Sequence, residues 1–246
     1  MLRQLVGKIK PRASAEENKD GLLVDVLLTR PDRVAVVALG SSSRSFMVEM
    51  LSNSQMDDPF DEVWTVNRGL RGIRHDKLFV MDDLRWLNEH NSGYAKFLRN
   101  HDKPIITSTP YAEYPMSVPY PFPEVMETIQ DDVFAVNTVA YMLAYAIHTR
   151  VKEVSIYGAD FVYPNGSTAE HGGQACAYLC GMMRQFDMVH RIPGDSTLLY
   201  ANTVKLRENG QLGREPYGYH RIKEMKDKRV KETKRKKAQQ ETKEGK

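Results

Sequence analysis

Short runs of apolar, mostly β-branched residues constrain the fold of this chain more than any other feature. The run RVAVVALG at 33–40 is apolar without alternation, which is typical of a strand covered on both faces. Further runs of this kind lie at 61–69, 77–84, 103–110, 153–161 and 187–193. Stretches of helical character lie at 43–54, 82–100, 133–150 and 170–186. Strands that alternate with helices predict an α/β fold with a doubly wound, mostly parallel sheet.

The length of 246 residues suits one large domain with flanking segments. We expect a polar lead-in over 1–30, a single α/β domain over 31–205 and a basic tail over 206–246. Residues 221–246 hold 12 Lys or Arg and 5 Asp or Glu, a net charge of +7 against +3 for the whole chain. The first 220 residues therefore carry −4. A tail of this kind binds DNA or RNA by counterion release, or else only keeps the protein in solution.

No apolar run reaches the roughly 18 residues that a membrane-spanning helix needs, and the N-terminal residues lack the apolar stretch of a secretory signal. We therefore expect a cytoplasmic protein. Cys176 and Cys180 lie at helical spacing, and we expect both to be buried, reduced thiols. The alternative, that His171 joins them as a third metal ligand, stays open.

A proline-rich segment, 110–125, interrupts the pattern. It contains prolines at 115, 119, 121 and 123, which exclude a central strand and a helix running through them. We expect a long irregular loop here. Its aromatic residues indicate that it is ordered and closes over a ligand.

The turn GSSS after the first strand is more polar than a plain connection requires. Gly40 allows a tight turn, and the backbone N–H groups and hydroxyls of Ser41, Ser42 and Ser43 would form an anion site at a helix N-terminus. The alternative is that a serine only caps the helix. The spacing does not match a P-loop, nor does it match the dinucleotide fingerprint.

Polar residues also follow the other predicted strands, and in an open α/β sheet such strand ends are where ligands bind. Asn67 would contact the base or ribose of a nucleotide, while Gly158 and Asp160 follow the fifth strand, where Asp160 would accept a hydrogen bond from a hydroxyl. Asp82 and Asp83 would bind Mg²⁺ bridging a nucleotide diphosphate. Each also has a structural alternative, as a turn residue or as a helix N-cap.

His171 is the candidate general base. It follows a Pro-Asn-Gly-Ser stretch at the start of a predicted helix, and an imidazole accepts a proton from a hydroxyl near neutral pH. Glu170 beside it is a competing base.

The motifs GSSSRS, VWTVNRGL, FVMDDL and IYGADF, within about residues 33–200, resemble those of a Rossmann-like group. The group includes archaeal-type 6-hydroxymethylpterin pyrophosphokinases and bacterial sialyltransferases. The resemblance implies a nucleotide-binding core that holds a phosphorylated donor at the serine turn and Asn67 and transfers a group to a hydroxyl.

We therefore expect a glycosyltransferase that uses a nucleotide-sugar and that carries Asp160 and His171 at its catalytic site. Together with the basic tail, this suggests an enzyme that modifies a base in DNA, as phage enzymes do. The alternatives are an ATP-dependent pyrophosphokinase with Mg²⁺ at Asp82 and Asp83, and a non-catalytic protein that binds nucleotides or nucleic acid.

Overall fold

The computed structural model describes residues 30–53, 58–67, 73–162 and 172–200. Their strands form one sheet in the order β5-β4-β3-β2-β1-β6-β7, and every pair of neighbours is parallel. The strands are β1 (Arg33–Val37), β2 (Glu62–Val66), β3 (Lys77–Val80), β4 (Ile105–Thr107), β5 (Ser117–Pro119), β6 (Glu153–Tyr157) and β7 (Val189–Arg191). The chain builds the sheet outward from β1 to β5 and then returns to add β6 on the other side of β1. Strand order therefore reverses between β1 and β6.

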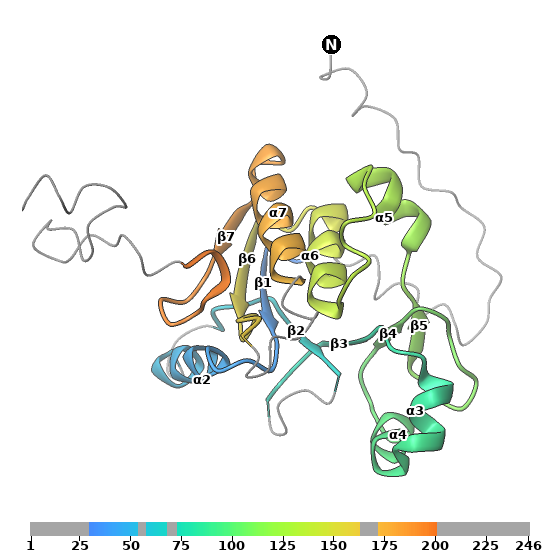
Figure 1. The fold of residues 1–246 in the computed structure, drawn as a ribbon. Helices are drawn as coiled ribbons and strands as arrows, with labels where there is room; N and C mark the ends of the chain where they lie inside the picture. Colours follow the sequence, from blue (N-terminus) through green and yellow to red (C-terminus); the bar gives the residue numbers. More distant parts are fainter. Residues whose placement is uncertain (1–29, 54–57, 68–72, 163–171, 201–246) are drawn as a thin grey trace, which may run out of the picture.

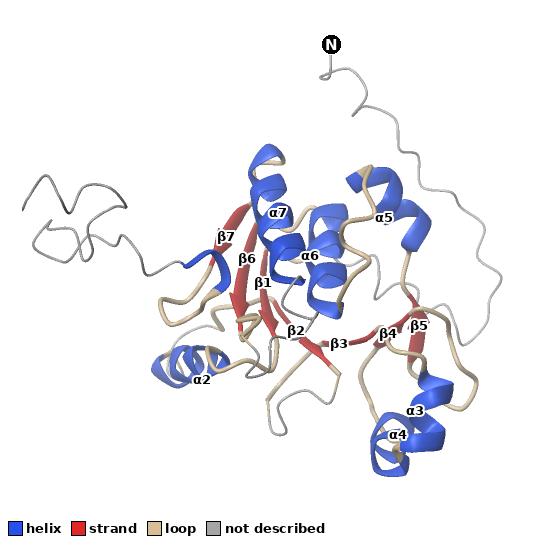
Figure 2. Cartoon of the chain, viewed as in Figure 1, coloured by secondary structure: helices blue, strands red, loops and turns tan. Residues whose placement is uncertain are grey.

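Helices cover both faces of the sheet, as Figures 1 and 2 show. One face carries α5 (Phe122–Ile129), α6 (Thr138–Thr149) and α7 (Gly172–Gln185). The other carries α2 (Ser43–Ser52), α3 (Leu84–His90) and α4 (Ser92–Arg99), and a short 3-10 turn, η3 (Leu198–Tyr200), follows β7. The predicted α/β, doubly wound sheet of Rossmann type is confirmed, and the sheet is parallel throughout.

The absence of alternation in β1 follows from its place at the centre of the sheet. Val34 and Val36 pack in the core beneath α6 and α7, whereas Ala35 and Val37 pack on the opposite face with Phe46 of α2. Because helices cover both faces of the sheet here, neither set of alternating side chains faces solvent, and the whole run is apolar.

The proline-rich segment differs from the prediction of an irregular loop. It contains the edge strand β5, which ends at Pro119, and α5 begins within it at Phe122. An edge strand tolerates proline because one side of its backbone has no partner, and Pro123 falls in the first turn of α5, where no N–H is needed. Tyr114 and Tyr120 are buried in the protein core. The segment is therefore part of the sheet and its packing.

Two predicted helical stretches differ from the helices that form, and in each case an asparagine caps the helix at the point of difference. The helix predicted over 133–150 starts at Thr138, because the side-chain oxygen of Asn137 accepts the N–H of Ala140. The helical stretch 82–100 forms two helices, and Asn91 caps the second by accepting the N–H of Tyr94. Cys176 and Cys180 are buried free thiols, as predicted.

The predicted lead-in and basic tail, with residues 221–246, lie outside the described residues apart from Arg30. Among the helices that the structure describes, none combines the length and the apolar character that crossing a bilayer requires.

Candidate functional site

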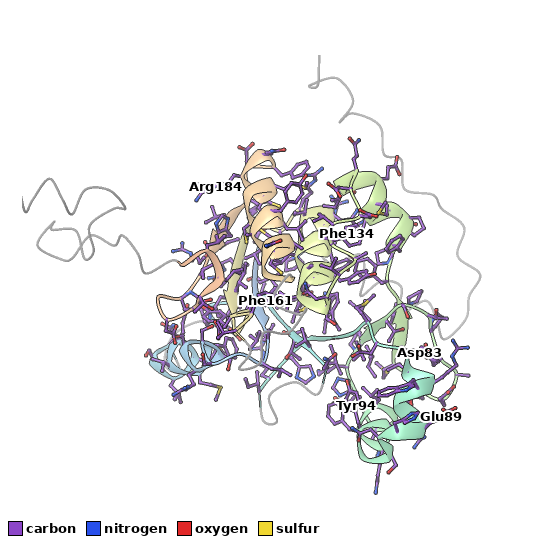
Figure 3. All side chains as sticks on the ribbon, viewed as in Figure 1. Asp83, Glu89, Tyr94, Phe134, Phe161 and Arg184 are labelled. Atoms are coloured by element: carbon purple, nitrogen blue, oxygen red, sulfur yellow. The ribbon has the colours of Figure 1, made fainter. Side chains whose placement is uncertain are left out.

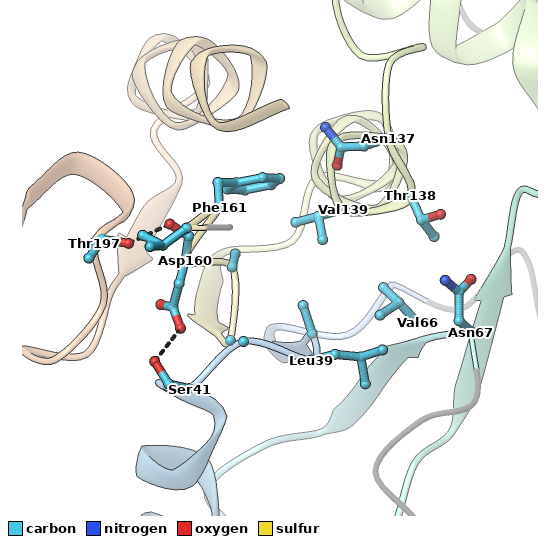
Figure 4. Close-up of a pocket in the computed structure, with 15 residues that line it drawn as sticks. Leu39, Ser41, Val66, Asn67, Asn137, Thr138, Val139, Asp160, Phe161 and Thr197 are labelled. Carbon is cyan, nitrogen blue, oxygen red and sulfur yellow. Dashed lines mark hydrogen bonds between the residues drawn. The ribbon is translucent and has the colours of Figure 1, made fainter. Parts of the chain in front are cut away.

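A pocket of about 640 Å³ lies where the strand order reverses, at the carboxyl ends of β1, β2 and β6. Figure 4 shows Leu39 from the end of β1 facing Val139 at the start of α6. The wall is formed by Ala38, Leu39, Gly40, Ser41, Val66, Asn67, Asn137, Thr138, Val139, Gly158, Ala159, Asp160, Phe161, Val162 and Thr197. The volume and position are those of a small-molecule site in an open α/β fold.

On one side of the pocket, the serine turn closes on Asp160. The N–H of Ser42 donates to Asp160 Oδ2 at 2.8 Å, and the Ser42 hydroxyl donates to Oδ1 at 2.6 Å. The Ser41 hydroxyl adds a bond to Oδ2 at 3.1 Å, and Ser42 Oγ accepts the N–H of Gly158 at 2.9 Å. A carboxylate from the segment after β6 therefore occupies the N-terminal end of α2.

These hydrogen bonds fix the charge state of Asp160. Burial raises the pKa of this carboxyl, but the bonds from Ser42, Ser196 and Ser41 outweigh it and leave the pKa below the ordinary value of 3.8. Asp160 is thus an ionised, hydrogen-bonded group at neutral pH. A carboxylate in this state is a poor proton acceptor, but it can hold the serine turn to the segment that follows β6.

The two glycines of the turn are required by close packing. A Cβ on Gly40 would lie 2.5 Å from the carbonyl oxygen of Gly158 and 2.6 Å from Asp160 Oδ2. Gly158 has a φ of +68°, and a Cβ there would collide with the backbone carbonyl of Ala38. Both positions bring the ends of β1 and β6 close enough for Asp160 to reach the serines.

The structure therefore differs from the predicted phosphate cradle at Gly40 to Ser43. Gly40 and Ser41 lie in the pocket wall, but Ser42 and Ser43 are buried outside it. The donors expected to bind a phosphate at Ser41 and Ser42 are bound to Asp160 instead. A free phosphate at this turn would meet the carboxylate, and the two negative charges would repel.

The opposite side of the pocket is open, and Asn67 lies there as predicted from its place after β2. Its φ of 49° is in the left-handed region, which asparagine tolerates better than most residues. Its side-chain oxygen is buried and has no hydrogen-bond partner in the described part of the chain. A buried acceptor without a donor is costly, so a ligand N–H or O–H would be favourable at this point.

The start of α6 forms a second part of the open side, which the sequence analysis missed. Asn137, Thr138 and Val139 line the pocket. Asn137 also joins two helices, because its Nδ2 donates to the carbonyl of Gly172 at 3.3 Å. The first N–H groups of a helix have no acceptor within it, so the N-terminus of α6 directs partial positive charge into the pocket.

Phe161 is the other wall residue that the sequence did not reveal. Its φ of 50° is an outlier for an aromatic side chain, and its ring lies against the start of α7. A Cβ on Gly172 would be 3.0 Å from the ring, and one on Gly173 would be 3.3 Å from it. In the sequence, the Gly-Gly pair after His171 is the feature that could have indicated this close contact. Strained backbone of this kind is common at functional sites.

The aspartates predicted to bind Mg²⁺ lie outside the pocket wall. Figure 3 shows Asp83 beside α3, well away from Phe161. Both aspartates are exposed. Asp83 pairs with the guanidinium of Arg85 and also accepts the backbone N–H of Arg85 at 2.9 Å, as a residue at a helix start does. Within the described ranges no group of three or more metal-ligating side chains occurs.

Two further predictions have separate outcomes. No pocket residue of the described chain comes from 110–125, and the closure of this segment over a ligand stays a prediction. His171 and Glu170 lie outside the described residues, and the base stays a prediction.

No protein-family model matches the chain, and no match was found among curated proteins. Among solved structures, it is similar to the sialyltransferase CstII from Campylobacter jejuni in complex with the substrate analogue CMP-3FNeuAc, with 15% identity, a TM-score of 0.43, and coverage of 75% of this chain and 91% of that one. A second structure of that protein, in complex with cytidine-5'-monophosphate, gives 14% identity, a TM-score of 0.42 and coverage of 75% and 85%. At these values, the function has to be argued from the site itself.

Proposed function

We propose that this protein is a glycosyltransferase that moves a sugar from a nucleotide-sugar to a hydroxyl acceptor. The observation that carries the proposal is the pocket at the reversal of strand order, which Asn67 and the start of α6 both line. Asn67 would accept a hydrogen bond from the base or ribose. The backbone N–H groups of Thr138 and Val139 would bind the phosphate.

In the proposed reaction, the acceptor oxygen forms a bond to the anomeric carbon of the sugar as the bond from that carbon to the phosphate oxygen breaks. The electron pair leaves on the nucleotide phosphate, whose charge the start of α6 stabilises. The hydroxyl proton passes to a base, for which His171 remains our candidate. Asp160 is a positioning residue in this scheme, since its oxygens are bound to Ser41 and Ser42.

The direct test of donor binding is a thermal-shift series with nucleotide-sugars and with nucleoside mono-, di- and triphosphates, each with and without Mg²⁺. A ligand of the folded state raises the melting temperature, and we expect the largest rise with one nucleotide-sugar. A rise with ATP and Mg²⁺ alone would favour a pyrophosphokinase, and no rise with any of them would exclude the proposal.

The base is tested by turnover with the donor so identified. His171→Ala should lower the rate at least a hundredfold while donor binding persists. His90→Ala, which changes an exposed histidine of α3, is the matched control and should keep full activity. Full activity of His171→Ala would exclude His171 as the base.

Binding of DNA or RNA through 221–246, a modified base in DNA as acceptor, a requirement for Mg²⁺ and a cytoplasmic location stay predictions from the sequence. A filter-binding assay of the full chain against a chain truncated after residue 220, at two salt concentrations, tests the tail.

A further inference from the structure

The wall of the pocket includes apolar side chains that are exposed to solvent. Leu39, two residues after the end of β1, is 51% exposed, and Val162, after β6, is 67% exposed. Other apolar wall residues, such as Val66 and Val139, are at least nine-tenths buried and serve the core. Leu39 and Val162 therefore add apolar surface to the pocket that folding alone does not use.

The charge of the wall restricts what this surface can bind. Among the described wall residues, Asp160 is the one ionisable side chain, and its carboxylate is held by the serine turn. These residues offer no lysine, arginine or histidine to an anionic acceptor. The partial charge of the α6 N-terminus is the positive feature of the wall, and the donor phosphate of the proposed function uses it.

Neighbouring backbone contacts fix the positions of both Leu39 and Val162. Phe161 holds its left-handed conformation because its ring packs on Gly172 and Gly173, and Val162 follows it directly. Leu39 is fixed by its neighbours, since Ala38 donates to the carbonyl of Tyr157 at 2.8 Å and Gly40 donates to that of Gly158 at 2.8 Å. The apolar surface is thus held in place by hydrogen bonds between the ends of β1 and β6 and by the packing of Phe161 on the start of α7.

We propose that Leu39 and Val162 bind an uncharged, apolar portion of the acceptor, next to the hydroxyl that receives the sugar. The proposal rests on the proposed function for its assignment to the acceptor. It predicts an acceptor glycoside with an alkyl or aryl group at this position, in preference to a nucleic acid.

The test compares octyl β-D-glucoside with methyl β-D-glucoside, both below the critical micelle concentration of the octyl compound. Saturation-transfer NMR on the full chain reports which ligand protons contact the protein, and titration gives the two affinities. We expect the alkyl protons to be saturated and the octyl compound to bind at least tenfold more tightly, since each buried methylene contributes about 0.8 kcal/mol, or about fourfold.

Variants locate the contact. Leu39→Ser and Val162→Ser should each reduce the advantage of the octyl chain at least threefold. Val48→Ser is the matched control, since Val48 is 62% exposed on α2 and does not line the pocket. All three side chains are exposed, so the substitutions should leave the fold intact. Equal binding of the two glucosides, or an equal loss in Val48→Ser, would overturn the proposal.

Donor binding, measured separately by thermal shift, distinguishes the two proposals. A nucleotide-sugar that binds while chain length has no effect would leave the proposed function standing and exclude the apolar acceptor site. A chain-length effect localised to Leu39 and Val162 without binding of any nucleotide-sugar would overturn both the proposed function and the acceptor role of the site.

Discussion

The strand ends after β1 and after β2 both carry polar residues at the same edge of the sheet, but only one of them is satisfied internally. After β1, the serines donate to a carboxylate from the segment after β6. After β2, the oxygen of Asn67 is buried and unpaired among the described residues. The first is a structural closure, and the second leaves an acceptor without a donor in a residue that lines the pocket.

The comparison shows that a turn with the composition of an anion site can supply its own anion. Asp160 makes the contacts with Ser41 and Ser42 that a phosphate would make, and it does so without the loss of freedom that ligand binding entails. The helix N-terminus of α2 is used in folding, whereas that of α6 faces the pocket.

Gly158→Ala should have the largest effect on stability. The φ of +68° and the collision of a Cβ with the carbonyl of Ala38 would force β1 and β6 apart. We expect the free energy of unfolding to fall by about 3 kcal/mol or more, measured by urea denaturation. Gly181→Ala is the control, because a Cβ at that position of α7 meets nothing within 4 Å. It should stabilise the protein by about 0.5–1 kcal/mol. Equal stability of Gly158→Ala and the wild type would contradict the closed turn.

Asp160→Ala should follow, since it leaves the N–H and hydroxyl of Ser42 buried without an acceptor. Such a loss lowers the free energy of unfolding by about 2–3 kcal/mol. The variant also uncovers the anion site that Asp160 occupies. Phosphate should therefore raise the melting temperature of Asp160→Ala and leave that of the wild type unchanged. A phosphate effect in the wild type alone would show that the turn is open without the substitution.

The depressed pKa of Asp160 makes a contribution to stability that depends on pH. Because the pKa is lower in the folded state than the ordinary 3.8, this contribution is complete above about pH 4 to 5. It is lost as the pH falls through the folded value. Asp160→Asn, which cannot ionise, should therefore show a smaller loss of stability than the wild type between pH 5 and pH 3. Parallel curves for the two proteins would contradict the shift.

Asn67→Gly should separate binding from folding. Glycine adopts the left-handed φ of 49° without strain, so stability should change by less than about 1 kcal/mol. Loss of the amide should weaken binding of the nucleotide-sugar about tenfold or more, measured by calorimetry. Gln130→Gly is the control, since Gln130 has a similar φ of 57° but caps α5 outside the pocket. Unchanged affinity of Asn67→Gly would remove Asn67 from the donor site.

The sequence predicted central strands such as β1 because burial on both faces leaves a direct mark on composition, but it missed the edge strand β5, whose prolines predicted a loop. It also predicted that Gly40, Ser41, Asn67, Gly158 and Asp160 meet at one edge, since parallel strands end together. It could not predict that Asp160 bonds to Ser42, because that contact joins residues 118 positions apart. The role of Phe161 depends on its φ and on glycines in a distant helix, and neither is visible from local pattern.

The smallest effect is expected for Asp83→Ala. Asp83 is exposed and pairs with Arg85, outside the pocket wall, so neither partner contributes to the open side. Asp83→Ala and its partner control Arg85→Ala should bind the nucleotide-sugar like the wild type, and titration with Mg²⁺ should give the same affinity in all three. If Asp83→Ala alone lost a Mg²⁺-dependent part of donor binding, the pyrophosphokinase reading would regain its metal site. The open side of the pocket would then extend past Asn67 to the end of β3. The comparison of the strand ends after β1 and β2 would then have to include the end of β3 as a further ligand-binding position.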